Sequence, residues 1–148
     1  MDKFKFQKVK SADQMVFCHT IRKKVFCEEQ KISEDIEFDN LDDICEHFLV
    51  FNNQIAIATA RVRKKEDCVY KIERVAVLIS YRKLKVGTLL IKKIIDQYQK
   101  IYKKNSIILH SQVSVENFYK NLNFIPYGKE FTEDGILHIA MKHKIKNF

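Results

Sequence analysis

The stretch of sequence that decides the fold is VAVLISYRKLKVGTLL, residues 75–90. Residues 75–78 are continuously apolar, which is typical of a buried strand. From residue 86 onward, apolar residues recur at the 3.6-residue period of a helix. The turn between the two carries three cations, Arg82, Lys83 and Lys85. Because the first N–H groups of a helix lack intrahelical partners and lie at the positive end of its dipole, this junction predicts an anion-binding site.

The helix after this turn has the strongest amphipathic pattern of the chain. Its apolar face comprises Val86, Leu89, Leu90, Ile94, Tyr98 and Ile101. An earlier helix begins at a capping-box pattern, Ser11-Ala12-Asp13-Gln14. The helical period places Phe17, Ile21 and Val25 on one face of that helix, which we expect to end near residues 28–30.

Strand-like segments occupy much of the remaining chain. They are residues 4–9, 47–51, 55–62, 69–78, 106–109, 124–131 and 136–141. Asn52-Asn53 and Glu133-Asp134-Gly135 have the chemistry of hairpin turns. Ala56, Ala58 and Ala60 share one face of their strand, and their small side chains leave room for close packing.

Two further segments complete the order of elements. The acidic stretch 34–43 lacks a clear period and predicts a loop with a short helical turn, while residues 115–122 predict a short helix. The order is strand, helix, three strands, helix, strand, helix and two strands. It predicts an α/β (α+β) fold with a central, mostly antiparallel mixed sheet of about seven strands flanked by helices.

The composition is that of a globular intracellular protein. The chain has 148 residues, of which 46% are hydrophobic and 31% charged, and we expect one domain over residues 1–148. No apolar run is long enough to cross a membrane, and the N-terminus lacks the apolar stretch of a signal peptide, so we expect a cytoplasmic protein without a membrane partner. The four cysteines (Cys18, Cys27, Cys45 and Cys68) form no C-x-x-C pair, which favours free, mostly buried thiols and no metal site.

The chain is basic, with a formal net charge of +8 and a pI of about 9.3. A basic surface accelerates association with nucleic acid, an anionic membrane or a phosphorylated small molecule. The lysines are scattered along the whole chain, so the net charge alone does not choose among these partners.

Two segments carry a resemblance to a known family. Residues 82–87, RKLKVG, resemble the acetyl-CoA-binding signature of the GNAT superfamily of N-acetyltransferases, with Arg82 in its first position and Gly87 at its last glycine. Residues 117–124, NFYKNLNF, resemble the second signature of that family, a helix with Phe-Tyr followed by Leu-Gly-Phe. The order of elements is also similar to the GNAT fold, so the resemblance covers essentially the whole chain.

Three shorter patterns resemble a bacterial subfamily of small-molecule acetyltransferases. They are Arg22-x-x-Val25-Phe26-x-x-Glu29-Gln30, Phe38-Asp39-x-x-Asp42 and His110-Ser111-Gln112. Two positions depart from the GNAT signatures. Lys85 replaces the middle glycine of the first signature, and Asn123 replaces the glycine of Leu-Gly-Phe. Asn tolerates the left-handed backbone that often ends a helix, whereas the Lys85 side chain must point away for phosphates to approach.

The resemblance implies a site for acetyl-CoA as co-substrate. The residues that would hold it are Val75, Ala76, Val77, Arg82, Lys83, Leu84, Lys85, Val86, Gly87, Thr88, Asn117, Phe118 and Tyr119. By this resemblance the backbone of residues 75–77 would pair with the pantetheine arm, and the Val77 N–H would polarise the thioester carbonyl. Gly87 in the first helical turn suggests that a ligand or a strand approaches the backbone closely there.

The resemblance also implies direct attack of a free amine on the thioester. Tyr119 matches the family's general acid, which donates a proton to the leaving sulfur. For the general base we expect Glu73, acting through water, with His110 and His47 as alternatives. Glu29, Asp39, Asp42 and His138 are the expected contacts of a cationic acceptor amine. The three carboxylates could equally cap helices or pair with Arg22 and Lys23.

The acceptor is expected to be a primary amine of a small molecule, with glucosamine 6-phosphate as the leading candidate. A polyamine, an amino acid or a protein amine remains open. Lys85 keeps a second class of function open, a GNAT fold that binds acetyl-CoA as a sensor without catalysis. A basic nucleic-acid-binding module would need a clustered basic face with stacking aromatic residues, which the dispersed lysines do not provide. A homodimer is compatible with the resemblance.

Overall fold

A seven-stranded sheet is the centre of the computed structural model, which describes residues 3–99 and 104–144. The strands are β1 (Phe4–Lys8), β2 (Glu46–Asn52), β3 (Ile55–Glu66), β4 (Val69–Val77), β5 (Ser106–Gln112), β6 (Phe124–Glu133) and β7 (Ile136–His143). The helices are α1 (Ala12–Arg22), which continues as a π-helical stretch (Lys23–Glu29), α2 (Glu34–Glu37), α3 (Val86–Gln99) and α4 (Glu116–Lys120). Short 3₁₀ turns span Asp42–Ile44, Ile79–Tyr81 and Val113–Val115.

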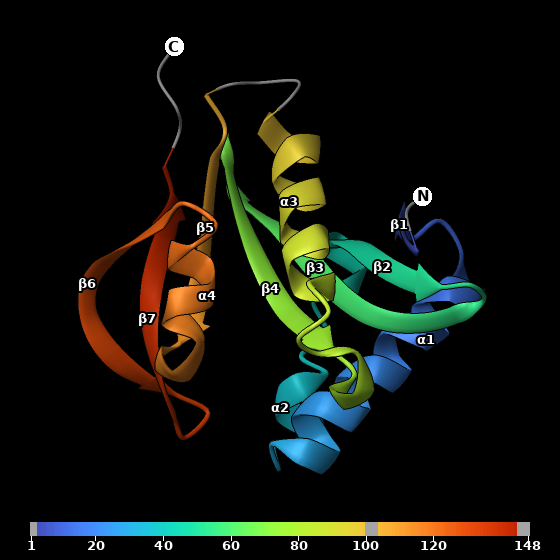
Figure 1. Cartoon of the computed structure of the whole chain (residues 1–148). Coiled ribbons are helices and arrows are strands. Elements are labelled where there is room, and N and C mark those ends of the chain that lie inside the picture. The colour runs from blue at the N-terminus through green and yellow to red at the C-terminus, as the bar shows by residue number, and fades with distance from the viewer. Residues whose placement is uncertain (1–2, 100–103, 145–148) are drawn as a thin grey trace.

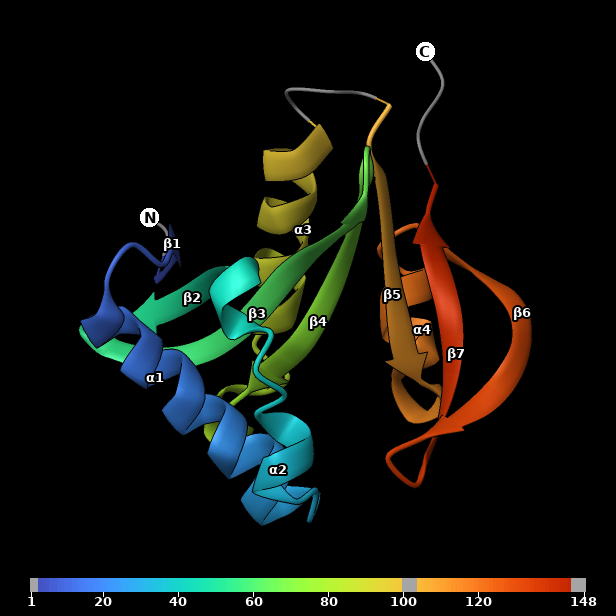
Figure 2. The ribbon, with the colours of Figure 1, turned by 180° about the vertical axis from the view of Figure 1, so that it is seen from behind.

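The sheet has the order β1-β2-β3-β4-β5-β7-β6, and all neighbours are antiparallel except β4 and β5 (Figure 1). Helices α3 and α4 lie over one face of the sheet, while α1 and α2 lie over the other face (Figure 2). The predicted fold is therefore confirmed. Within the described residues, no helix has the length and apolar character to span a bilayer.

Helix α3 buries the face that its period predicts. The buried residues are Val86, Leu90, Ile91, Ile94, Ile95 and Tyr98. They share one core cluster with Ala58 and Ala60 of β3, whose small side chains let the helix approach the sheet. Leu89 is partly buried against this cluster, and Ile101, predicted on the same face, lies outside the described residues.

Helix α1 begins at the predicted capping box. The Ser11 hydroxyl accepts the Gln14 N–H at 3.2 Å, and the Gln14 side chain accepts the Lys10 N–H at 2.8 Å. The predicted buried face was partly wrong, because Phe17 is 42% exposed. The buried stripe runs instead through Cys18, Ile21, Arg22, Val25 and Phe26, one step around the helix. Arg22 is buried through ion pairs, which a hydrophobic pattern cannot show.

A β-bulge corrects the prediction for the alanines of β3. Val50 pairs with Ala58 and Phe51 with Ala56, so Ile57 is an extra residue in β3. Such a bulge reverses which face the following residues occupy. Ala56 consequently packs in the cluster under α1, while Ala58 and Ala60 pack under α3.

Two smaller expectations also need correction. The hairpin after β2 turns at Asn53 and Gln54 rather than at Asn52-Asn53, and Asn53 adopts the left-handed conformation with φ of 55°. Among the cysteines only Cys18 is buried, since the other three are partly exposed. The prediction of mostly buried thiols therefore holds for Cys18 alone.

Candidate active site

The site begins where β4 and β5 separate. Their parallel pairing extends only from Val69 and Ser106 to Ile72 and Leu109, although both strands continue beyond it. The two strands diverge in Figure 1, and a cleft of about 820 Å³ opens at this place. The far end of β4, the turn before α3, the end of the π-helical stretch, α4 and the β6–β7 hairpin all contribute to its wall. The backbone of β4 beyond Ile72 has no strand partner on the β5 side within the described residues.

A second bulge shapes this part of β4. Arg61 pairs with Glu73 and Thr59 with Ala76, so β4 has an extra residue at Arg74 or Val75. Arg74 is left-handed, with φ of 55°, a conformation that costs a non-glycine residue about 1–2 kcal/mol. Its guanidinium is held by the carboxylates of Glu37 and Asp39 at 3.0 and 3.1 Å, which helps to fix the bulge.

The backbone N–H of Val77 points into the cleft. The Leu78 N–H donates to the carbonyl of Ile57 at 2.9 Å, so Ala58 and Val77 form the non-hydrogen-bonded kind of antiparallel pair. In such a pair the N–H and C=O groups of both residues point away from the partner strand. Arg82 confirms this direction, because its Nε donates to the outward carbonyl of Val77 at 2.9 Å.

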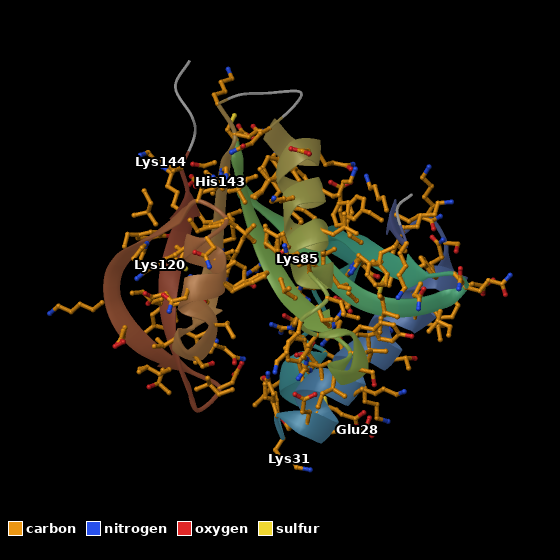
Figure 3. All side chains as sticks on the ribbon, viewed as in Figure 1. Glu28, Lys31, Lys85, Lys120, His143 and Lys144 are labelled. Carbon is orange, nitrogen blue, oxygen red and sulfur yellow. The ribbon has the colours of Figure 1, made fainter. Side chains whose placement is uncertain are left out.

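The basic turn adopts two left-handed residues. Lys83 has φ of 67° and Lys85 has φ of 62°. Lys85 therefore keeps the positive φ that a glycine adopts easily, although it replaces the signature's glycine. Figure 3 labels Lys85 at the start of α3. The first bond within α3 runs from the Leu89 N–H to the Lys85 carbonyl at 3.0 Å, which leaves the three preceding N–H groups available for an anion.

Arg82 and Glu29, predicted in different sites, contact each other. Both terminal nitrogens of Arg82 donate to the Glu29 carboxylate, at 2.7 and 2.8 Å. This hydrogen bonding holds the pKa of Glu29 below its ordinary value. The pair ties the end of the π-helical stretch to the basic turn across the mouth of the cleft.

Gly87 allows α4 to pack tightly on the start of α3. A Cβ at Gly87 would lie 3.2 Å from the ring of Phe118 and 3.7 Å from the side chain of Val77. The expected close approach is thus made by an aromatic side chain as well as by the strand. Most of the predicted cofactor-binding residues line the cleft, but Leu84 and Asn117 do not.

Tyr119 lies in the wall of the cleft and is 7% exposed. The rings of Phe118 and Phe124 pack edge-on against it, with centroids at 4.9 and 5.8 Å. Burial raises the pKa of the Tyr119 phenol well above its ordinary value. The residue therefore keeps its proton throughout the physiological range.

Below the bulge, the sheet carries a network of buried ion pairs. Arg61 is 1% exposed and donates to Asp39, Asp42 and Glu73 at 2.7 to 3.0 Å. Arg22 joins it through Asp42, at 2.9 Å, and binds Glu37 at 2.8 Å. The sequence patterns contain Arg22, Asp39 and Asp42, but nothing in them indicates that these residues pair with Arg61.

Glu73 is part of this network. Its Oε2 accepts from Arg61 at 2.7 Å, while Oε1 accepts from Arg63 at 2.7 Å and lies 3.3 Å from the Lys71 ammonium. Burial opposes the ionisation of Glu73, but these cations outweigh it and lower its pKa. A carboxylate held in this way is a weak proton acceptor near neutral pH.

The three histidines considered for the site differ in whether they line the cleft. His47 is buried, its Nε2 bonds to the Asp42 carbonyl at 2.9 Å, and it is not among the residues that line the cleft. His110 and His138 do line the cleft. His110 Nδ1 and His138 Nε2 lie 3.7 and 3.8 Å from the same oxygen of Glu133. The His138 Nδ1 bonds to the Ile136 carbonyl at 2.7 Å, so this ring nitrogen carries the proton.

Comparison with known proteins agrees with this geometry. The profile of the acetyltransferase (GNAT) domain matches residues 8–145. A relative from Bacillus subtilis is 37% identical over 141 residues, which are 91% of this chain and 92% of the relative. The protein ElaA of Escherichia coli is 32% identical over 138 residues, covering 91% of this chain and 90% of ElaA.

Solved structures share the same fold. The crystal structure of Escherichia coli ElaA has a TM-score of 0.82 at 30% identity and covers 95% of this chain and 99% of ElaA. A protein of Lactobacillus plantarum has a TM-score of 0.90 at 24% identity, over 98% of this chain and all of its own. The chain therefore belongs to the GNAT family and is an acetyl-CoA-dependent N-acetyltransferase.

Proposed function

We propose that this protein transfers an acetyl group to a primary amine of a small molecule by direct attack within a ternary complex. The observation that carries the proposal is the open edge of β4 beyond Ile72, which brings the outward Val77 N–H, the basic turn and Tyr119 to one cleft. Acetyl-CoA supplies the acetyl group as a thioester. In this proposal the bound amine attacks the thioester carbonyl directly, and the thiolate of CoA leaves without a covalent enzyme intermediate.

The residues of the turn fit the phosphates of acetyl-CoA. The unpaired N–H groups at the start of α3 suit an anion, and the ammonium groups of Lys83 and Lys85 add positive charge. Arg82 positions the turn through its bonds to the Val77 carbonyl and Glu29. In this proposal the Val77 N–H donates a hydrogen bond to the oxyanion that develops on the thioester carbonyl.

Tyr119 serves as the general acid in this proposal. Its raised pKa keeps the phenol protonated, so a proton is available for the departing thiolate. Its rigid packing between two aromatic rings fixes the direction of the hydroxyl.

For the general base we propose His110 in place of Glu73. Both oxygens of Glu73 already accept from cations, whereas His110 faces the cleft on the strand next to Glu73. Burial and the nearby Lys71 charge lower the pKa of His110, so the imidazole is neutral and able to accept a proton at neutral pH. Glu73 then acts as a positioning residue for the cations around it, while His138 and Asp39 stay predicted contacts of the acceptor.

The acceptor itself stays a prediction. Neither ElaA nor the other relatives indicate an amino sugar, so glucosamine 6-phosphate is one member of a panel rather than the assigned substrate. The panel should include polyamines, amino acids and a peptide N-terminus. Release of free CoA thiol, together with mass spectrometry of the acetylated amine, tests the proposal. A protein that binds acetyl-CoA but acetylates no amine in a broad panel would be a sensor instead.

A further inference from the structure

The ion-pair network beside the cleft carries more positive than negative charge, while Glu133 and Asp134 of the β6–β7 hairpin add negative charge elsewhere in the wall. The ion-pair network joins Arg22, Arg61, Arg63, Lys71 and Arg74 to Glu37, Asp39, Asp42 and Glu73. It therefore holds one cation more than it holds carboxylates.

The excess is concentrated at Arg63 and Lys71. These two cations share a single oxygen, Oε1 of Glu73, at 2.7 and 3.3 Å. The other oxygen of Glu73 is taken by Arg61. Lys71 is 8% exposed, and within residues 3–99 and 104–144 it forms an ion pair with Glu73 Oε1 alone. A buried ammonium is stable only when anionic or polar groups surround it. A single carboxylate oxygen that Lys71 shares with Arg63 leaves this ammonium with too few partners.

Unused polar atoms in the same wall point to a ligand. The Arg63 Nε and the His110 Nδ1 are buried and form no hydrogen bond within the described part of the chain. Arg63, Lys71 and His110 all line the cleft. Buried polar atoms without partners are rare in folded proteins, and each one calls for an explanation such as a bound group.

We propose that Arg63 and Lys71 form a subsite for an anionic group, a carboxylate or a phosphate, on the acceptor amine. This inference rests on the proposed function and narrows its substrate class to amines that carry an oxyanion. The anion accepts from the Arg63 guanidinium and the Lys71 ammonium, beside Glu73. Glu133, near His110 and His138, provides negative charge for the ammonium end of such a zwitterion.

Matched amines test this subsite. The pairs are ethanolamine with O-phosphoethanolamine, and 3-aminopropan-1-ol with β-alanine, so that one arm reports on phosphate and the other on carboxylate. Lys71→Met should lower kcat/KM for the preferred anionic amine by about tenfold or more, the effect of losing one charge-assisted hydrogen bond. Because the Lys71 charge also lowers the pKa of His110, kcat/KM for the neutral partner amine is compared on the pH plateau of each protein, where it should fall far less than kcat/KM for the anionic amine. The KM for acetyl-CoA should not change. The matched control is Lys64→Met, which removes an exposed lysine of β3 and should change neither.

A selective loss with either anion supports the subsite and identifies its anion. Two results would overturn it. One is an equal loss of kcat/KM on anionic and neutral amines in Lys71→Met, and the other is an equal kcat/KM of the wild type for both kinds of amine. Calorimetric titration of O-phosphoethanolamine and β-alanine into the same variants needs no turnover. If no amine is acetylated, the proposed function fails, and the titration alone decides the subsite: binding that is equal in wild type and Lys71→Met rejects it.

Discussion

Tyr119 lies between Phe118 and Phe124, and this packing sets both its direction and its protonation state. We expect Tyr119→Phe to lower kcat by about a hundredfold, the usual contribution of a general acid, because the leaving thiolate loses its proton donor. Acetyl-CoA affinity should change little, since the ring remains. Steady-state kinetics and calorimetry measure the two quantities. Tyr127→Phe, at an exposed tyrosine of β6, is the control, and unchanged turnover in Tyr119→Phe would remove Tyr119 from the mechanism.

His110 and Glu73 can be separated by the pH dependence of the rate. The pKa of His110 is lowered, so its basic form dominates at neutral pH and is lost only as the pH falls through that lowered value. We expect His110→Asn to lower kcat/KM strongly and to remove this acidic limb. Glu73→Gln should keep the shape of the wild-type profile, at a reduced rate if its cations move. If Glu73→Gln abolishes the limb and His110→Asn preserves it, Glu73 is the base.

Lys85 tests how the basic turn is built. The left-handed backbone at this position costs a lysine about 1–2 kcal/mol of folding free energy. A glycine avoids this cost but loses more conformational entropy on folding. We therefore expect Lys85→Gly to alter the free energy of unfolding by less than about 1 kcal/mol and to preserve or improve acetyl-CoA affinity. Lys85→Ala keeps the backbone cost without the charge. A large loss of affinity in both variants would show that the lysine itself grips the phosphates.

At the scale of elements, the ion-pair network joins α1, α2, β3 and β4 behind the cleft. Burial opposes the ionisation of Asp42, but Arg22 and Arg61 outweigh it and lower its pKa to about 2, against an ordinary value of 3.8. A carboxyl whose pKa is lower in the folded than in the unfolded protein stabilises the fold at pH values above the unfolded-state pKa. This contribution is lost as the pH falls through the folded-state pKa. Burial raises the pKa of Glu37, so Glu37 has the opposite effect: its contribution to the free energy of unfolding falls as the pH rises through its unfolded and folded pKa values.

The free energy of unfolding should therefore fall steeply between about pH 4 and pH 2. Asp42→Asn should be less stable at pH 7 and lose less stability over that range, as urea unfolding at each pH would show. Asp43→Asn, in the same short turn, is the control, because Asp43 forms no ion pair with any described residue. An equally steep loss in Asp42→Asn and wild type would place the acid sensitivity elsewhere.

Elements are more predictable from the sequence than the contacts between them. The periods of β4 and α3 are local, so the sequence alone locates both. The bulges at Ile57 and Arg74 depend on pairing with a neighbouring strand, and no local pattern marks them. The predicted face of α1 was confirmed at Ile21 and Val25 but wrong at Phe17. The sequence pattern also missed Arg22, which is buried because carboxylates distant in the sequence pair with it.

At the scale of the molecule, the site arises because β4 and β5 part after Ile72 and Leu109. Two sequence signatures predict residues on both sides of this opening. They cannot predict the link between Arg82 and Glu29, nor the role of Gly87 in seating Phe118, since both involve segments far apart in the chain. The surplus cation of the ion-pair network likewise emerges only when α1, α2, β3 and β4 are assembled.

The central claim is that acetyl-CoA binds along the open edge of β4, and residue-resolved amide hydrogen exchange tests it most directly. In the free protein the Val77 N–H points away from β3 into the cleft, whereas the Ala76 N–H faces β3. We predict that acetyl-CoA slows exchange at Val77 by about tenfold or more and leaves Ala76 nearly unchanged. Unchanged exchange at Val77 in protein saturated with acetyl-CoA would contradict the account.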